Sequence, residues 1–467
     1  MRTKIIATLG PASNNVEVLK QFLAQGVRIF RLNFSHGSAK DFAPLVQKIR
    51  TLEEDLKEPI TLLQDLCGPK IRIGKLKKSP LTIHKNSFYF LGKGEETSEN
   101  FIPFEDKSLL EHLKPNDIVK ISDGGLSFEV KTNSPTELIL EAKDSGIISS
   151  GKGITFPGKK LKLSAITEKD KQDLIEGLEL GLDAIALSFV QGPEDIAKAK
   201  AICDKKLGRC VPIIAKLERQ AALDRLEDIV SIADGIMVAR GDLGLECPLP
   251  QLPFIQKKII RLCRKMGKPV IVATQMLLSM VNNPMPTRAE TTDVANAILD
   301  STDCVMLSEE TAIGKYPVEC ITYLKQIAEE AEKNIFKIRK QIDLPANGHS
   351  EMFIAHAACI LADKLQAKAL LAHTNSGTTA RLLSSFRPKE YIYGLCPNPT
   401  VSKYMNFFWG VIPTIIDENP KDHLQRVELY VENSSLFKSQ DVLVITAGHP
   451  KKNEEHAPTN LIKVYIK

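Results

Sequence analysis

The sequence lacks long hydrophobic runs. No stretch among its 467 residues approaches the roughly 20 consecutive apolar side chains that a helix needs to cross a bilayer. The apolar run that follows Lys4 stops at Gly10-Pro11, which is too short for a secretory signal, and no cleavage-like site follows it. We therefore expect a protein of the cytoplasm.

Paired cysteines and an excess of one charge are also missing. The nine cysteines are odd in number and form no Cys-x-x-Cys pair, which is typical of a reducing compartment where thiols serve as small core residues. The 62 lysines and arginines are interspersed with 57 acids, so nucleic acid is not expected as a partner. A chain this long can form two or three domains.

Eight short apolar runs of β type, each followed by an amphipathic stretch, recur in two parts of the chain. Strands of a parallel barrel are buried on both faces and therefore appear as nearly continuous apolar runs. The count favours an α/β fold with a closed (β/α)8 TIM barrel over an open sheet. The predicted strands are Ile5–Thr8, Val27–Phe34, Ile60–Leu66, Ala184–Val190, Val211–Leu217, Gly235–Val238, Pro269–Ala273 and Cys304–Leu307.

Two further domains are predicted beside the barrel, which comprises residues 1–68 and 161–340. Residues 69–160 contain short strands bounded by Gly, Pro, Asn and Ser, which indicates a small β-barrel domain inserted in one βα loop, where it can act as a lid. After a linker at Asp343–Gly348, residues 341–467 form an open-sheet α/β domain. The strands predicted in these two domains are Phe88–Leu91, Asp117–Ile121, Leu126–Val130, Glu137–Leu140, Ala369–His373, Tyr391–Cys396, Val411–Ile416, Val442–Ala447 and Leu461–Ile466.

Polar and charged side chains stand at most of the predicted barrel strand ends. Because the carboxyl ends of barrel strands open to one mouth, and burying such groups unpaired costs several kcal/mol each, we expect a functional cluster there. An ion-pair network that only closes the barrel is the alternative. The residues are Arg31, Asn33, Ser35, Asp65, Lys216, Glu218, Arg240, Asp242, Thr274, Ser308 and Glu310.

Glu218 and Asp242 follow neighbouring strands, so two carboxylates can meet at one point. Mg²⁺ prefers such a site, with most of its octahedral shell left to waters and substrate oxygens. Lys216 lies two residues before Glu218 and so faces the same side of its strand, and Arg31 adds a second cation. Two cations beside a sparsely coordinated metal suit the stabilisation of a transferring phosphoryl group or an enolate.

Several long motifs resemble those of the pyruvate kinase family. They lie across the whole predicted barrel, and the inserted and C-terminal domains fall where that family has them. The motifs are Thr3–Pro11, Arg31-Leu32-Asn33-Phe34-Ser35-His36-Gly37, Ile214–Glu218, Met237-Val238-Ala239-Arg240-Gly241-Asp242-Leu243-Gly244, Ala273-Thr274-Gln275-Met276-Leu277 and Pro286-Thr287-Arg288-Ala289-Glu290.

The resemblance implies transfer of a phosphoryl group from phosphoenolpyruvate to ADP. Glu218 and Asp242 would then bind Mg²⁺ or Mn²⁺, Lys216 would neutralise the phosphoryl group and the nascent enolate, and Arg31 would hold the phosphate. Gly241, Asp242 and Thr274 would receive the carboxylate, and Thr274, Ser308 and Glu310 would lie near the carbon that gains a proton. The nucleotide and its own metal would meet His36, Arg72, Lys152 and Asp123. Family likeness also suggests a homotetramer.

The sequence departs from the family pattern at two places. Potassium-requiring members have a glutamate where this chain has Lys70, in Leu66-Cys67-Gly68-Pro69-Lys70. We expect the Lys70 ammonium to replace the potassium ion, although Asn33, Ser35, Asp65 and Leu66 of the cation cage remain; pairing of Lys70 with a surface acid is the alternative. In Ser308-Glu309-Glu310, Glu309 replaces the usual glycine, which makes the placement of its neighbours harder to predict.

The loop Thr374-Asn375-Ser376-Gly377-Thr378-Thr379 precedes a helix predicted to begin near Ala380. Hydroxyls and backbone N–H groups at a helix N-terminus can bind an anion, and the family uses this position for a sugar-phosphate or nucleotide effector. A plain helix cap is the rival interpretation. Two other functions compete with a kinase: a metal-dependent carbon–carbon lyase or aldolase, which needs no nucleotide site, and a catalytically silent metabolite sensor.

Overall fold

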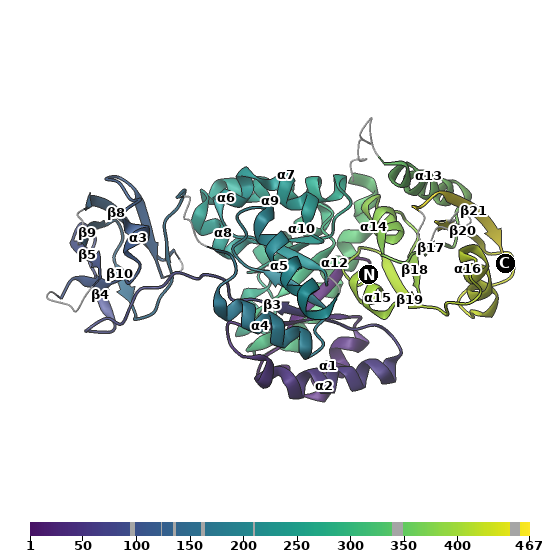
Figure 1. Cartoon of the computed structure of the whole chain (residues 1–467), viewed down its shortest axis with the longest axis horizontal. Coiled ribbons are helices and arrows are strands. Elements are labelled where there is room, and N and C mark those ends of the chain that lie inside the picture. The colour runs from purple at the N-terminus through teal and green to yellow at the C-terminus, as the bar shows by residue number, and fades with distance from the viewer. Residues whose placement is uncertain are drawn as a thin grey trace.

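The structure is a computed structural model, and it describes residues 1–93, 99–122, 124–133, 137–159, 164–208, 211–338, 349–448 and 458–467. Three bodies follow one another along its longest axis: the inserted β domain, the barrel and the C-terminal domain (Figure 1). No helix in the described part of the chain is long and apolar enough to cross a membrane.

The central body is a closed parallel barrel, and each predicted barrel strand is present. The strands are β1 (Lys4–Thr8), β2 (Ile29–Asn33), β3 (Thr61–Asp65), β12 (Ala184–Leu187), β13 (Ile213–Leu217), β14 (Gly235–Ala239), β15 (Val270–Ala273) and β16 (Cys304–Leu307). They pair in the order β1-β16-β15-β14-β13-β12-β3-β2. Every residue of β3, β13 and β14 is buried, which explains why β14 is apolar throughout and why the polar residues of the other two strands need partners inside the fold.

Helices surround the barrel, and capping signals in the sequence mark several of their ends. For example, Thr287 and Glu290 form a capping box at the start of α10, and Gly208 ends α5 with a left-handed φ of 63°. The helices are α1 (Val16–Ala24), α2 (Ala39–Leu56), α4 (Glu168–Glu179), α5 (Pro193–Leu207), α6 (Gln220–Asp224), α7 (Leu226–Ile232), α8 (Arg240–Glu246), η1 (Leu249–Gln251), α9 (Leu252–Lys265), η2 (Leu278–Val281), α10 (Arg288–Leu299), α11 (Glu309–Ala312) and α12 (Pro317–Ile338).

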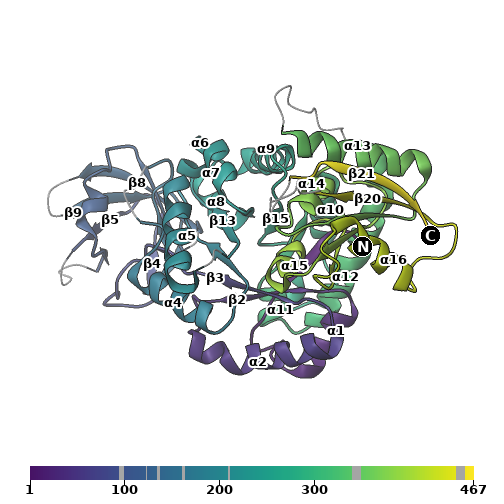
Figure 2. The ribbon, with the colours of Figure 1, turned by 45° about the vertical axis from the view of Figure 1, so that its right-hand side comes forward.

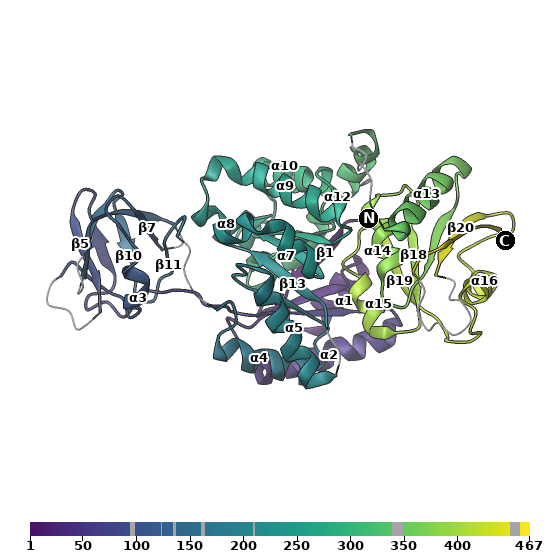
Figure 3. The same cartoon turned by 45° about the horizontal axis from the view of Figure 1, so that its top comes forward.

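The inserted domain stands at the end of the molecule and is joined to the barrel by narrow connections (Figures 1 and 3). Its described strands pair into a six-stranded sheet, β11-β7-β8-β9-β5-β6, and a two-stranded sheet, β10-β4. Lys120 Nζ donates to the Leu245 carbonyl of α8 at 2.9 Å, so the domain touches the barrel beside its mouth. The elements are β4 (Leu81–Ile83), β5 (Phe88–Gly92), β6 (Phe101–Pro103), α3 (Lys107–Leu110), β7 (Ile118–Ile121), β8 (Leu126–Asn133), β9 (Glu137–Ala142), β10 (Gly146–Ile148) and β11 (Ile154–Thr155).

The C-terminal domain has a five-stranded sheet in the order β19-β18-β17-β20-β21, with only β21 antiparallel to its neighbour. It packs against the amino ends of the barrel strands, where Thr61 Oγ1 donates to the Lys403 carbonyl at 2.6 Å (Figure 2). The predicted linker lies outside the described residues, and the domain boundaries remain predictions. The elements are α13 (Ser350–Leu365), β17 (Ala369–His373), α14 (Thr378–Ser385), β18 (Ile392–Cys396), α15 (Pro399–Met405), β19 (Val411–Ile415), α16 (His423–Asn433), β20 (Val442–Ala447) and β21 (Leu461–Ile466).

Candidate active site

Lys216 is the centre of a buried charge network at the barrel mouth. Its ammonium lies 3.0 Å from Asp65 Oδ1 and 3.0 Å from Glu218 Oε1, and it donates to Ser188 Oγ at 2.7 Å. Burial alone would lower the pKa of Lys216, but the attraction of Asp65 and Glu218 raises it above its usual value. The side chain is therefore a permanent cation near neutral pH.

Arg31 extends the network toward β1. Its Nε lies 2.6 Å from Asp65 Oδ2, and its Nη1 donates to Thr8 Oγ1 at 3.0 Å. Burial would raise the pKa of the Asp65 carboxyl, but Arg31 and then Lys216 hold it below its usual value. Asp65 thus fixes both cations in place, and the Arg31 guanidinium, which has five N–H donors, keeps donors available for an anion in the mouth.

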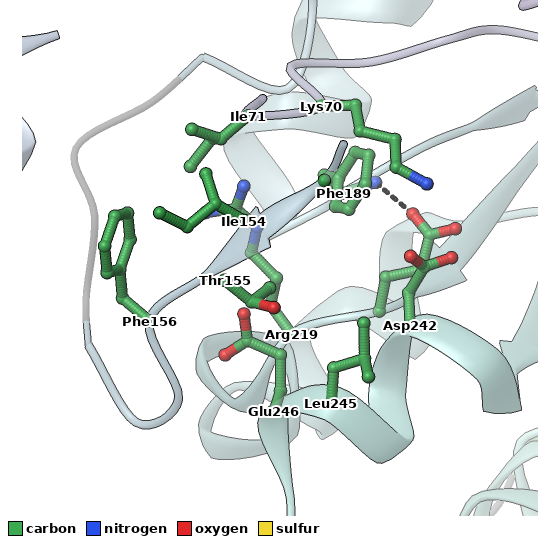
Figure 4. Close-up of a pocket in the computed structure, with 12 residues that line it drawn as sticks. Lys70, Ile71, Ile154, Thr155, Phe156, Phe189, Arg219, Asp242, Leu245 and Glu246 are labelled. Carbon is green, nitrogen blue, oxygen red and sulfur yellow. Dashed lines mark hydrogen bonds between the residues drawn. The ribbon is translucent and has the colours of Figure 1, made fainter. Parts of the chain in front are cut away.

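Glu218 and Asp242 form the pair of carboxylates that the sequence predicts. Glu218 is 2% exposed, its Oε2 accepts from the backbone N–H of Phe189 at 2.7 Å, and both acids line one cavity together with Lys70 (Figure 4). Burial raises the pKa of the Glu218 carboxyl; Lys216 lowers it, and Asp242 raises it. Neighbouring carboxylates that repel one another fit a divalent cation, which would relieve that repulsion.

Glu218 and Asp242 are the two carboxylates that the sequence predicts as metal ligands at this point. No cluster of three or more acidic, histidine or cysteine side chains suited to a metal occurs among the residues that the structure describes. An octahedral ion bound by Glu218 and Asp242 would therefore take its other ligands from water and substrate, which is the way Mg²⁺ is usually held at phosphate-transfer sites.

Thr274 and Gly241 lie side by side at the mouth. The Gly241 N–H donates to Thr274 Oγ1 at 2.8 Å, and Thr274 has a left-handed φ of 69°. Arg240 does not face the mouth with them: its guanidinium pairs with Asp293 at 2.6 Å and donates to the Thr274 carbonyl at 2.7 Å. Arg240 thus holds the unusual backbone turn that presents the Thr274 hydroxyl.

Ser308 and Glu310 are joined by a tight local contact. The Ser308 N–H donates to Glu310 Oε2 at 2.7 Å, and Glu310 Oε1 accepts from the N–H of Leu277 at 3.1 Å. Burial raises the pKa of the Glu310 carboxyl, which is 1% exposed. Glu309, which replaces the usual glycine, is exposed at the start of α11, and its negative charge also raises the pKa of Glu310.

Sequence reasoning missed two contributors to the site. Ser188 donates to the Leu66 carbonyl at 2.6 Å and accepts from Lys216, and Phe189 adopts a left-handed φ of 55° that directs its N–H to Glu218. Both lie just beyond β12, inside a run predicted to be strand up to Val190. The sequence did carry a signal for Ser188, because it is a polar residue at the end of a barrel strand, as the predicted site residues are.

Comparisons with known proteins identify the family of the chain. Two family models match the chain: the barrel domain of pyruvate kinase over residues 1–321, and the alpha/beta domain of pyruvate kinase over residues 353–465. The chain belongs to the pyruvate kinase family. As a member, it transfers the phosphoryl group of phosphoenolpyruvate to ADP and yields pyruvate and ATP, and the family generally uses Mg²⁺.

Individual pyruvate kinases match over the full length of the chain. One from Agrobacterium vitis is 41% identical over 96% of this chain and 94% of its own length. Another from Thermotoga maritima is 38% identical over 99% of this chain and 98% of its own. The crystal structure of a pyruvate kinase from Cryptosporidium parvum superposes with a TM-score of 0.91 at 31% identity, covering 100% of this chain and 96% of that one.

The nucleotide residues suggested by the pyruvate kinase resemblance are divided between lid and barrel. Arg72 Nη1 donates to the Gly151 carbonyl at 3.1 Å, next to Lys152, so these two lid residues are close together. His36 lies on the barrel in the turn after β2, where its N–H donates to the Asn33 carbonyl at 3.0 Å. Asp123 lies outside the described residues.

Lys70 lies at the base of the lid, beside the two carboxylates that are predicted to bind the metal ion. It lines the same cavity as Glu218 and Asp242, and Figure 4 shows its amino group on the side of the cavity where the acidic side chains lie. Of the other residues of the predicted cation cage, Asn33 Oδ1 accepts from the Ser35 N–H at 3.2 Å, and Asp65 and Leu66 contact the Lys216 network described above. Lys70 therefore adds positive charge at the mouth.

The loop from Thr374 to Thr379 lines a cavity of about 490 Å³ in the C-terminal domain. Helix α14 begins at Thr378, slightly earlier than predicted, and its N-cap is Gly377, whose N–H donates to Thr374 Oγ1 at 2.9 Å. His373 and His423 also line the cavity, and their rings stack with centroids 4.1 Å apart. Burial, and then His423, lowers the pKa of His373 to about 3, so its ring is neutral at physiological pH.

Proposed function

We propose that this pyruvate kinase uses Lys216, Glu218 and Asp242 as one catalytic unit around a divalent metal ion, Mg²⁺ or Mn²⁺. The observation that carries the proposal is the 3.0 Å contact between Lys216 and Glu218, beside a second carboxylate in the same cavity. A bound ion would supply electrophilic stabilisation to the carboxylate and phosphate of phosphoenolpyruvate. A coupled assay of pyruvate from phosphoenolpyruvate and ADP, with Mg²⁺ or with EDTA, tests it; activity undiminished by EDTA would refute it.

The protein groups have separate tasks in this scheme. Arg31 and Lys216 hold the phosphoryl group while its bond to the enol oxygen breaks and a bond to the terminal oxygen of ADP forms. Lys216 then stabilises the enolate oxygen, which carries the negative charge that the broken bond leaves behind. Gly241 and Thr274 receive the substrate carboxylate, and the Thr274, Ser308 and Glu310 region lies where the methylene carbon gains its proton.

The lid residues complete the nucleotide site. Arg72 and Lys152 lie together on the lid. Together with His36 of the barrel, they would hold the phosphates of ADP. Asp123 would bind the metal ion that accompanies the nucleotide. Closure of the lid over the mouth would exclude water, so that the phosphoryl group passes to ADP instead of being hydrolysed. The contact of Lys120 with Leu245 supports a lid that reaches α8, the helix bearing Asp242.

Loss of either metal carboxylate gives a direct prediction. We expect Glu218→Gln and Asp242→Asn each to weaken Mn²⁺ binding by at least about tenfold. Loss of a residue that only supports a metal ligand already costs that much, and these two residues are the proposed ligands themselves. In a Mn²⁺ titration, electron paramagnetic resonance measures the concentration of free ion, from which the dissociation constant follows. The matched control is Glu227→Gln, an exposed acid on α7, which should bind Mn²⁺ like the parent protein. Equal affinity in Glu218→Gln and the control would contradict the assignment.

We further propose that the enzyme needs no potassium, because the Lys70 ammonium supplies the monovalent charge at the mouth. Its place in the cavity with both carboxylates supports this (Figure 4). The residues of the cation cage, Asn33, Ser35, Asp65 and Leu66, would then surround an ammonium in place of an ion.

The loop before α14 is proposed to bind a phosphorylated effector, either a sugar phosphate or a nucleotide. The cap residue Gly377 has no side chain with which to cap the helix, which favours an anion over the plain cap interpretation. The cavity beside the loop is large enough for a ligand of this class, and the neutral His373 can stack on or hydrogen-bond to its body.

Acidic substitutions test the effector site. We expect Thr378→Asp and Thr379→Asp to abolish activation by hexose phosphates and by AMP, because a carboxylate there repels the phosphate. Initial rates at low phosphoenolpyruvate, with and without each compound, measure this. Ser435→Asp, an exposed change in the same domain, should leave activation intact. Unchanged activation in both threonine variants would rule out this loop.

We also propose a cytoplasmic location. None of the eight described cysteines forms a disulfide, which supports this location. A homotetramer is proposed on family likeness alone, and analytical ultracentrifugation would test it: a monomer at micromolar concentration would contradict it.

A further inference from the structure

The backbone of Phe189 orients one of the two predicted metal ligands. Phe189 has a left-handed φ of 55°, which is rare for a bulky residue, and its N–H donates to Glu218 Oε2 at 2.7 Å. A backbone conformation of this kind persists only where the surrounding structure holds it. The contacts of the Phe189 ring therefore decide how firmly the Glu218 carboxylate is oriented.

Gly68, just before the lid, packs closely against the Phe189 ring. A Cβ atom at Gly68 would lie 2.7 Å from Phe189 Cδ2 and 2.8 Å from Ser188 Cβ, so no side chain fits there. Gly68 has a left-handed φ of 68°, and its N–H donates to Asp170 Oδ1 of α4 at 2.9 Å. The ring cannot move in this direction without displacing a backbone segment that is itself held by α4.

Arg219 also contacts the ring. Its guanidinium carbon, Cζ, lies 5.1 Å from the centre of the Phe189 ring, within the range of a cation–π contact. The Arg219 side chain is only 6% exposed, and its Nε has no hydrogen-bond partner among the residues that the structure describes. Because the cation is so deeply buried, the aromatic ring is an important partner for it.

The charge of Arg219 acts against metal binding. Burial lowers the pKa of its guanidinium, and the attraction of Glu246, Glu218 and Asp242 offsets this only in part. Arg219 lines one cavity with these three acids (Figure 4). A cation beside two metal-binding carboxylates repels a metal ion, so a favourable effect of Arg219 on the metal must come from its packing.

We propose that Arg219 is a positioning residue for the metal site. It holds the Phe189 ring against Gly68, and through the Phe189 N–H it fixes the Glu218 carboxylate in the orientation that binds the metal ion. This inference rests on the proposed role of Glu218 as a metal ligand. Residues that orient a ligand without touching the metal commonly raise metal affinity. Arg219 thus acts on the ion through two other residues.

Mn²⁺ binding by Arg219→Met tests the proposal. We expect the dissociation constant to rise by about threefold or more, the order of one cation–π contact between largely buried groups. Loss of the positive charge by itself would lower this constant, so a rise identifies positioning. Arg225→Met, at an exposed arginine between α6 and α7, should bind Mn²⁺ like the parent protein. A dissociation constant for Arg219→Met equal to or below that of Arg225→Met would overturn the proposal.

Two further variants separate the possible failures. If Glu218→Gln weakens Mn²⁺ binding but Arg219→Met does not, only the positioning role is wrong. If Glu218→Gln also binds Mn²⁺ like the parent, the proposed function is wrong as well. Arg219→Lys serves if Arg219→Met does not fold: it keeps the charge but loses the planar group that stacks on the ring, so its dissociation constant should also rise.

A double-mutant cycle tests the route through the ring. Phe189→Leu should weaken Mn²⁺ binding, and adding Arg219→Met to it should cause little further loss, because both changes break the same contact. At saturating Mn²⁺ the kcat of Arg219→Met should stay close to that of the parent, since the bound ion itself orders the carboxylate. Fully additive losses in the cycle, or a large loss of kcat at saturating Mn²⁺ with an unchanged dissociation constant, would contradict the proposal.

Discussion

Lys216→Met is expected to lower kcat for pyruvate formation by about 10³-fold or more, the order seen when one group that stabilises developing charge is removed. Methionine keeps the length of the side chain but removes the ammonium between Asp65 and Glu218. The fold should survive, because Asp65 keeps Arg31 at 2.6 Å and Glu218 keeps the Phe189 N–H at 2.7 Å. Steady-state kinetics with saturating phosphoenolpyruvate and ADP measure the loss.

Metal binding separates a catalytic role of Lys216 from a structural one. The variant should still bind Mn²⁺, because both carboxylates remain and have lost a competing cation. Lys171→Met, on an exposed part of α4, is the matched control and should retain the parent kcat. A Lys216→Met enzyme that keeps its kcat within tenfold would show that the network only closes the barrel.

Lys70→Glu is expected to make the enzyme dependent on potassium. The change replaces a cation by an anion beside two carboxylates, so without a monovalent ion the activity should fall by about 10²-fold. Potassium should restore it, because Asn33, Ser35 and Asp65 of the cation cage are still present. Rates in tetramethylammonium buffer, with and without added potassium chloride, measure the effect.

The parent enzyme is the first comparison for this test, and its rate should rise less than about tenfold on adding potassium. An enzyme that lacked a needed stabilising charge would gain more than about tenfold when potassium supplied it. Lys77→Glu makes the same charge reversal at an exposed position of the lid and should not create a dependence on potassium. If Lys70→Glu were fully active without potassium, the ammonium would not be the substitute for the ion.

The barrel and the charge network at its mouth follow from local patterns in the sequence. Strands buried on both faces are mostly apolar, so each apolar run shows directly where a strand lies, as β14 does. Alternation along a strand places Lys216 and Glu218 on one face, and the structure brings their charged atoms to 3.0 Å. Both predictions rest on geometry within a few residues.

Other features depend on contacts that no local pattern reveals. Strands β4, β6, β10 and β11 have only two or three residues each, too few for a period to show. Arg240 resembles a site residue by position, but it pairs with Asp293 of α10.

The most direct test of the account is a crystal structure of the full chain with Mn²⁺ and phosphoenolpyruvate, in which anomalous scattering locates the metal. We expect one manganese ion bound by carboxylate oxygens of both Glu218 and Asp242, with the Lys216 ammonium in contact with the phosphoryl group. Manganese bound elsewhere, or by only one of these acids with Lys216 turned away from the substrate, would contradict the account.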